Sequence, residues 1–310
     1  AVSRPSSMRG LAFALVALTF VSSMAITNDV ALITFVPLAL VVLSEAGEGR
    51  YAASVVVLMT VSANLGSMLL PVGDPQNLFL YRASGMDFPQ FVLIMAPIVA
   101  LSAAMLVVAL LIVFRGNAEG HSDCPSRKSL PKPTGRQRLM FVSYLLLFAL
   151  SIMAVVGLID AYPVAVLVVL VLLFLDRRTL TKVDYGLLLT FVALFVFVGN
   201  MARVPAVHEA LSALVGIAPF YAAVGSSQVI SNVPAAVLLS GFTNDWTALI
   251  VGTNLGGLGT PIASMASLIS LKIATASGLV GKRHYLAVFT AWNVVFLAVL
   301  CAANAVFGWA

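Results

Sequence analysis

Charged residues are scarce in this sequence of 310 residues: 9% are Asp, Glu, Lys or Arg, against about 25% in an average soluble domain. Hydrophobic residues make up 61% of the chain, and the mean hydropathy is +1.06. This composition excludes an ordinary soluble protein and favours an integral membrane protein whose apolar runs form helical spans of about 20 residues. The short alternating strands that are typical of a membrane β-barrel are missing as well.

The sequence also lacks the residues that several kinds of chemistry require. The two cysteines, Cys124 in a polar loop and Cys301 in the last apolar run, suggest neither a disulfide nor a metal site. No GxxxxGK[ST] motif is present, so the sequence contains no ATP site of the kind that drives primary pumps. Ser226 and Ser227 have no buried histidine partner, and acidic clusters that would bind Mg²⁺ are absent. A membrane-embedded enzyme is therefore a remote alternative, and the net charge of +5 indicates loop topology, not a nucleic-acid partner.

A short polar string occurs twice, each time inside a long apolar run. Residues 22–28 read SSMAITN, and residues 226–232 read SSQVISN. A single copy would carry little information. Two copies at matching places in the two halves of the chain indicate an internal repeat.

A second matching motif, Asn-Leu-Gly, follows each string. It begins at Asn64 and at Asn254, and each asparagine has a proline seven residues later. Glycine and proline interrupt helices, and backbone groups freed inside hydrocarbon must be paired or must line a cavity. Matching broken helices in two halves of a chain are the best sequence indication of a transporter binding site.

The predicted fold class is an all-α polytopic membrane protein with two inverted-topology repeats, each containing a re-entrant hairpin and a broken helix. Residues 11–26 and 30–43 are each short for a membrane span, so we expect them to form the first hairpin, with Thr27-Asn28-Asp29 at its tip. One long tilted span is the alternative. Residues 207–242 are expected to form the second hairpin, with Ser231-Asn232-Val233 at its tip.

The two broken helices follow the hairpins. The first begins at residue 51, is interrupted over Asn64–Asn77 and resumes at 78–81. The second covers residues 245–275 and is interrupted around Asn254–Pro261. Further spans are expected at residues 90–114, 139–157, 161–175, 184–203 and 285–308.

The chain divides into a first repeat (1–114), a linker (115–138) and a second repeat (139–310). Lys and Arg concentrate in the linker, in residues 176–184 and at Lys282-Arg283. If these segments are cytoplasmic, the C-terminus lies outside and the two hairpins enter the membrane from opposite faces. The second half has three spans before its hairpin and the first half has none, so we expect N-terminal scaffold spans to be missing.

The paired tips and broken helices resemble the ion transporter superfamily. This group includes divalent anion:sodium symporters, arsenite permeases and NhaD-type Na⁺/H⁺ antiporters, with citrate-transporter-like domains. The motifs that carry the resemblance are Thr27-Asn28-Asp29-Val30-Ala31, Asn64–Asn77, Ser231-Asn232-Val233-Pro234 and Thr253–Pro261. The resemblance implies a secondary transporter of a small anion in the plasma membrane, driven by Na⁺ or H⁺ without another cofactor. It also implies an elevator motion against a scaffold and a homodimer.

In the symporters, Ser-Asn-Thr at each tip binds the substrate carboxylate and helps to hold sodium. Carried over to this sequence and combined with the two helix breaks, the resemblance implies two overlapping sets of residues. The substrate-binding set is Thr27, Asn28, Asp29, Asn64, Ser231, Asn232, Val233, Asn254, Thr260 and Pro261. The cation-coupling set, where Na⁺ would bind, is Ser23, Asn28, Asp29, Gly66, Asp74, Ser227, Asn232 and Gly256.

Asp29 departs from the pattern of the symporters. A carboxylate repels a dianion unless it is protonated or holds a cation, so Asp29 disfavours a dicarboxylate and favours arsenite-permease-like or proton-coupled chemistry. Asp29 and Asp74 are the only acids expected at membrane depth, where a charge indicates function. Asp29 would also suit the start of a helix over residues 30–43. The alternative within the same fold is a Na⁺/H⁺ antiporter that exchanges ions at Asp29 and carries no anion.

Overall fold

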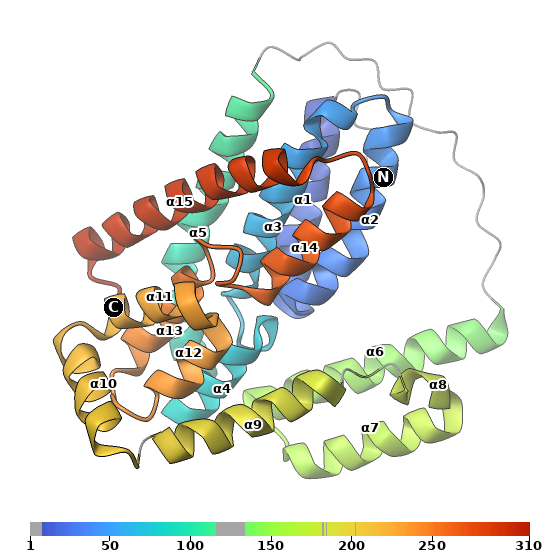
Figure 1. The fold of residues 1–310 in the computed structure, drawn as a ribbon. Helices are drawn as coiled ribbons and strands as arrows, with labels where there is room; N and C mark the ends of the chain where they lie inside the picture. The colour runs from blue at the N-terminus through green and yellow to red at the C-terminus, as the bar shows by residue number, and fades with distance from the viewer. Residues whose placement is uncertain (1–7, 116–133, 182, 184, 202) are drawn as a thin grey trace. The chain divides into compact units, whose positions relative to one another are not determined.

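The computed structural model describes residues 8–115, 134–181, 183, 185–201 and 203–310. All the regular elements in these ranges are helices, as the sequence predicts (Figure 1). Five helices are long and apolar enough to cross a membrane: Met8–Ala25, Asn28–Glu45, Phe88–Val113, most of Gly135–Val156, and Lys282–Phe307. The chain is therefore an all-α polytopic membrane protein.

The chain packs as two compact units. Unit 1 combines Ala1–Pro125 with Phe197–Ala310, and unit 2 is Ser126–Val196. This division follows packing and does not test the predicted repeat boundaries, which stay a prediction. Most of the predicted linker, residues 116–133, lies outside the described residues.

Unit 1 holds both hairpin motifs and both helix breaks. Its first part consists of α1 (Met8–Ala25), α2 (Asn28–Glu45), η1 (Gly49–Tyr51), α3 (Ala52–Ser67), η2 (Pro71–Gly73), α4 (Pro75–Ser84) and α5 (Phe88–Val113). Its second part consists of α10 (Pro205–Ile217), α11 (Pro219–Ile230), α12 (Asn232–Leu239), α13 (Trp246–Gly256), α14 (Met265–Ala276) and α15 (Lys282–Phe307).

Helix α3 forms the centre of unit 1. Every residue from Val55 to Ser67 is buried, and α1, α2, α5, α14 and α15 all pack against this helix. A helix that is apolar around its whole circumference is stable only when it is surrounded in this way. The polar residues near its C-terminal end, Asn64 and Ser67, are therefore held inside the protein.

Each of the two parts of unit 1 has a helix that packs against the other part. Helix α14, which follows the second break, packs along α2 of the first hairpin. Helix α4, which follows the first break, packs on α12 and α13 (Figure 1). Each half-helix beyond a break therefore contacts the other repeat, and the two breaks are brought together.

Both predicted breaks are present. Helix α3 ends at Ser67 and α13 ends at Gly256, and α14 begins only at Met265. The predicted restart of the first broken helix at residue 78 is wrong, since α4 begins at Pro75. Proline at the first helical position costs no hydrogen bond, because its missing N–H would have no partner in the helix.

The hairpin arms differ from the predicted ones. Helices α1 and α2 have 18 residues each, which is enough to cross a bilayer, so the expectation that each arm is too short was wrong. Whether they form a re-entrant hairpin stays a prediction. In the second repeat, α11 begins at Pro219 after a non-helical Ala218, and the preceding residues form the separate helix α10.

Unit 2 contains α6 (Gly135–Val156), α7 (Ala161–Leu175), α8 (Arg177–Leu180) and most of α9 (Tyr185–Met201). Asp176, between α7 and α8, accepts hydrogen bonds from Thr179 Oγ1 at 2.8 Å and from Tyr144 Oη at 2.9 Å. These bonds stabilise the carboxylate and lower the pKa of Asp176 below its ordinary value. They tie the end of α7 to α6.

Candidate functional site

The two tips have the same local geometry. Asn28 begins α2 and Asn232 begins α12, and both are buried. The Asn28 Oδ1 atom accepts a hydrogen bond from the N–H of Asp29 at 2.8 Å, and the Asn232 Oδ1 atom accepts one from the N–H of Val233 at 2.9 Å. The side-chain oxygen of each asparagine thus binds the start of its own helix, and the side-chain NH₂ group can donate hydrogen bonds to other segments or to a ligand.

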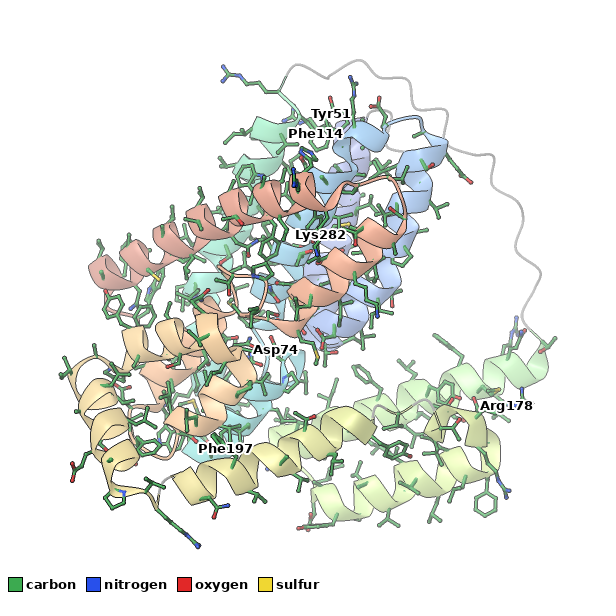
Figure 2. The ribbon with its side chains drawn as sticks, in the orientation of Figure 1. Tyr51, Asp74, Phe114, Arg178, Phe197 and Lys282 are labelled. Carbon is green, nitrogen blue, oxygen red and sulfur yellow. The ribbon has the colours of Figure 1, made fainter. Side chains whose placement is uncertain are left out.

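Asp74 lies at the first tip. Its Oδ2 atom accepts hydrogen bonds from Asn28 Nδ2 at 2.9 Å and from Ser67 Oγ at 3.2 Å. Asn28 Nδ2 also donates to Asn64 Oδ1 at 3.2 Å. Asp74 is 5% exposed, and Figure 2 shows it near the middle of unit 1. The first tip, the end of α3 and the start of α4 therefore meet at one buried carboxylate.

Hydrogen bonds continue from this carboxylate into the second repeat. Ser264 Oγ donates to Asn64 Oδ1 at 3.1 Å, and Asn254 Nδ2 donates to Asn77 Oδ1. These pairs are separated by 200 and 177 residues in the sequence. We name the connected set the central polar cluster: Asn28, Asn64, Ser67, Asp74, Asn77, Asn254 and Ser264.

Three members of the central polar cluster, Ser67, Asn77 and Ser264, were not among the predicted site residues. The sequence held a signal for two of them. When the two Asn-Leu-Gly motifs are aligned and extended, Asp74 falls opposite Ser264, and Asn77 falls opposite Ser267. Both broken helices thus resume with polar side chains at matching positions.

Six buried polar atoms in and around the cluster have no hydrogen-bond partner among the described residues. They are Asp29 Oδ1, Asn64 Nδ2, Gln76 Nε2 and Oε1, Asn254 Oδ1 and Ser267 Oγ. An unpaired buried polar atom costs about 1–3 kcal/mol, so such atoms are normally satisfied by a ligand or by water. Their gathering at the two helix breaks fits a binding site that offers both donors and acceptors.

The second tip is held in a strained conformation. Ser231 has φ 74° and ψ 155°, and it is the one non-glycine residue with positive φ in the described part of the chain. Thr27, its counterpart, has φ −50°. The backbone N–H of Asn232 and the hydroxyl of Ser231 both donate to the carbonyl oxygen of Ala263, at 2.9 and 3.3 Å. The break before α14 therefore anchors this tip, and strain of this kind concentrates at functional sites.

The predicted serine and glycine positions pack against each other. Ser23 Oγ donates to Phe20 O at 2.9 Å, and Ser227 Oγ donates to Ala223 O at 2.7 Å, each within its own helix. A Cβ atom at Gly66 would overlap Phe20 O and Ser23 Oγ, and one at Gly256 would crowd Ser227. Glycine is therefore required where α3 crosses α1 and where α13 crosses α11. Their cation-coupling role stays a prediction.

Two further predicted residues lie in the second break but outside the central polar cluster. Thr260 is exposed, and both its N–H and its hydroxyl bond to Gln228, to Oε1 at 2.9 Å and to the carbonyl oxygen at 3.0 Å. Pro261, the next residue, is partly exposed, as is Val233 beside the second tip.

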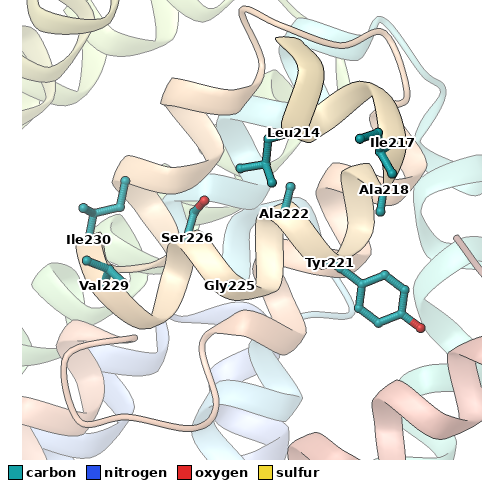
Figure 3. Close-up of a pocket in the computed structure, with 9 residues that line it drawn as sticks. All are labelled: Leu214, Ile217, Ala218, Tyr221, Ala222, Gly225, Ser226, Val229 and Ile230. Atoms are coloured by element: carbon teal, nitrogen blue, oxygen red, sulfur yellow. The ribbon is translucent and has the colours of Figure 1, made fainter. Parts of the chain in front are cut away.

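An apolar groove of about 540 Å³ lies along α10 and α11 (Figure 3). Its lining is Leu214, Ile217, Ala218, Tyr221, Ala222, Gly225, Ser226, Val229 and Ile230. None of these residues belongs to the central polar cluster. The groove offers little to a charged ligand, so the central polar cluster is the candidate site.

Comparisons with known proteins find similarity to transporters and membrane proteins. A family model described as "Citrate transporter" matches residues 3–243. An uncharacterized transporter of Methanocaldococcus jannaschii is 32% identical over 270 residues, which cover 87% of this chain and 72% of that protein. The inner membrane protein YbiR of Escherichia coli is 31% identical over 291 residues, which cover 91% of this chain and 74% of YbiR.

Proposed function

Because this chain belongs to the citrate transporter family and is an integral membrane transporter, we propose that it moves a small anion across the cytoplasmic membrane by secondary active transport. The anion is an inorganic oxyanion such as arsenite, or a carboxylate. The coupling ion is Na⁺ or H⁺. The name of the YbiR relative supports an inner-membrane location.

One observation carries this proposal: a buried polar cluster joins both repeats at their helix breaks. Asn64 and Ser264 are hydrogen-bonded across the repeats, and so are Asn77 and Asn254. Broken helices at membrane depth are tolerated only where they line a cavity or are buried in protein. A site shared by two inverted repeats also suits alternating access, in which one part rocks or slides around a fixed site.

The donors around the tips suit an anion. Helices α2 and α12 begin at the two tip asparagines, and the first N–H groups of a helix attract negative charge. Asn64 Nδ2 and Ser267 Oγ are buried and unpaired among the described residues, so each can donate to an incoming oxyanion. Ser231 and Thr27 add hydroxyl groups at the tips. This set offers neutral donors and not a cluster of fixed positive charges.

The carboxylates suit the coupling ion. Asp74 accepts a hydrogen bond from Asn28, and Asp29 directly follows Asn28 in the sequence. A bound cation or proton at either acid would remove the negative charge that otherwise repels the substrate. Binding of the ion and the anion would then be linked, which is the requirement for symport. We place the coupling step at this pair, and we expect an elevator motion and a homodimer.

A Na⁺/H⁺ antiporter of the same fold is the second candidate. It is favoured by the same two acids, since an antiporter needs a carboxylate that binds Na⁺ and H⁺ in turn. No anion would then be carried, and the unpaired donors Asn64 Nδ2 and Ser267 Oγ would donate hydrogen bonds to water.

Uptake measurements in proteoliposomes separate the two candidates. Labelled arsenite, citrate and succinate are offered under an inward Na⁺ gradient, under an inward proton gradient and without a gradient, and a trapped pH dye reports proton movement. Accumulation of one anion that depends on a gradient supports the proposal. Na⁺-driven proton efflux without uptake of any anion supports the antiporter instead.

A further inference from the structure

Gln228 joins the second hairpin to the second broken helix. Its Nε2 atom donates to the carbonyl oxygens of Gly256 at 2.8 Å, Leu258 at 2.9 Å and Val224 at 3.3 Å. Its Oε1 atom accepts from the N–H of Thr260 at 2.9 Å. One side-chain amide thus serves backbone groups of the unwound segment after α13.

The unwound segment is shaped around this amide. Gly259 has φ +103°, and a Cβ atom there would overlap the Gln228 Oε1 atom. The hydroxyl of Thr260 also donates to the Gln228 carbonyl oxygen at 3.0 Å. The contacts come from both backbone and side chain, so the side chain of Gln228 is fixed in place despite being only partly buried.

Carbonyl oxygens that converge on one point at an unwound helix are also the groups that hold a coupling cation in transporters. The Gln228 Nε2 atom stands at such a point. It brings two N–H donors, which satisfy carbonyl oxygens without adding a net charge. A cation cannot occupy the same point while the amide is there.

The first repeat lacks an amide at the matching position, although Asn77 Nδ2, beyond the first break, donates to the carbonyl oxygen of Ser67 at 3.4 Å. Met24 stands at the position that matches Gln228 in the paired strings, and a thioether has no N–H to donate. The first repeat instead has Asp74 and Asp29 near its break, where the second repeat has Ser264 and Val233. Charge is therefore concentrated in one repeat, and a neutral amide fills the carbonyl site of the other.

We propose that Gln228 takes the place of a coupling cation in the second repeat, so that the first repeat alone binds the coupling ion. This inference rests on the proposed function for the coupling ion. What it adds is that the two repeats are unequal. In the second repeat the carbonyl site is filled permanently by the Gln228 amide, whereas in the first repeat the corresponding site is filled only when an ion binds.

Thermal unfolding of the purified full chain in NaCl and in choline chloride, at equal ionic strength, tests this inference. Gln228→Glu replaces the donor group by an oxygen of almost the same shape, which repels the carbonyls unless a cation lies between them. We expect this variant to lose several degrees of melting temperature in choline chloride and to regain them in NaCl. Gln228→Met, which copies the first repeat, should show a weaker form of the same Na⁺ response. Val229→Ala, at the exposed neighbour, is the control.

The reciprocal change is Met24→Gln, which should remove any Na⁺-dependent stabilisation of the wild type. Equal destabilisation of Gln228→Glu in both salts would make Gln228 a merely structural residue and would overturn the inference. A wild type with neither a Na⁺ response nor uptake driven by a Na⁺ or proton gradient would refute the proposed function. The inference about Gln228 would then be decided by whether Gln228→Glu gains a Na⁺ response.

Discussion

The hydroxyl of Ser264 donates a hydrogen bond to Asn64 Oδ1 at 3.1 Å, although 200 residues separate the two in the sequence. Asn64 lies in the last turn of α3, and Ser264 immediately precedes α14. The same Asn64 oxygen accepts from Asn28 at the first tip. A single amide oxygen therefore links the first hairpin, the first broken helix and the second broken helix.

Removing the Ser264 hydroxyl should weaken this link. We expect Ser264→Ala to lower the free energy of unfolding by about 0.5–1.5 kcal/mol, the usual net worth of one hydrogen bond, and to weaken anion binding. Thermal unfolding and uptake kinetics measure the two effects. The control is Ser240→Ala, which loses only a local bond to Val237 O at 2.9 Å. If Ser264→Ala has no greater effect than the control, the link between the repeats has no functional weight.

Asp74→Asn should abolish ion coupling while the protein still inserts and folds. The substitution keeps the shape and an acceptor for Asn28 and Ser67, but it removes the negative charge that a cation or proton would neutralise. Gradient-driven uptake in proteoliposomes measures the effect. Asp245→Asn is the matched control, since Asp245 caps α13 through a bond from the Ala248 N–H at 3.0 Å and asparagine caps helices equally well. Wild-type accumulation by Asp74→Asn would exclude the coupling role.

Asp29→Asn tests the acid that the sequence singled out. The Asp29 Oδ1 atom is buried and has no hydrogen-bond partner among the described residues, so it is available to a coupling ion. We expect Asn at this position to abolish accumulation against a gradient, whereas Val233→Ala, at the matching position of the second tip, should be mild. Counterflow exchange of the anion, which needs no net driving force, should survive in Asp29→Asn. Unchanged gradient-driven uptake would rule out this role.

Gly66→Ala should destabilise the protein, because the added methyl group would overlap the Phe20 carbonyl oxygen where α1 crosses α3. Overpacking of this kind costs about 1–3 kcal/mol. Gly225→Ala in α11 meets open space, so it should be neutral or stabilising by up to about 1 kcal/mol. Thermal unfolding of both variants in detergent compares them directly. Equal stability of the two would contradict the close crossing of α1 and α3.

Cysteine labelling tests the predicted topology. In a background without native cysteines, Ser277→Cys precedes the cationic Lys282-Arg283 and should be protected from a membrane-impermeant maleimide added to intact cells. Asn244→Cys lies in a loop without Lys or Arg and should be labelled. Both positions are exposed in the protein, so accessibility depends on the side of the membrane. The reverse pattern would invert the orientation.

Much of the secondary structure was predictable from the sequence. The apolar runs gave most helices within a few residues, and the helix breaks after Asn64 and Asn254 followed from glycine and proline chemistry. The predicted helix boundaries were wrong at positions where the same residue can either begin or end a helix. Pro75 begins α4 three residues before the predicted restart, and Pro219 divides the expected first arm of the second hairpin into α10 and α11. A proline signals a helix end or a helix start equally well, and the sequence alone does not say which.

The sequence by itself determined that the chain is an all-α membrane protein with two matching polar breaks, because composition, apolar run length and breaker residues act locally. The tertiary structure alone decided which polar groups meet. The sequence placed both Asp29 and Asp74 in the cation-coupling set, and the structure shows that Asp74 is the one bound by Asn28 and Ser67. Because α4 and α14 each pack against the other repeat, Asn77 contacts Asn254 and Ser264 contacts Asn64. Such pairings depend on how buried helices cross, and helix crossing is set by side-chain packing between segments far apart in the chain.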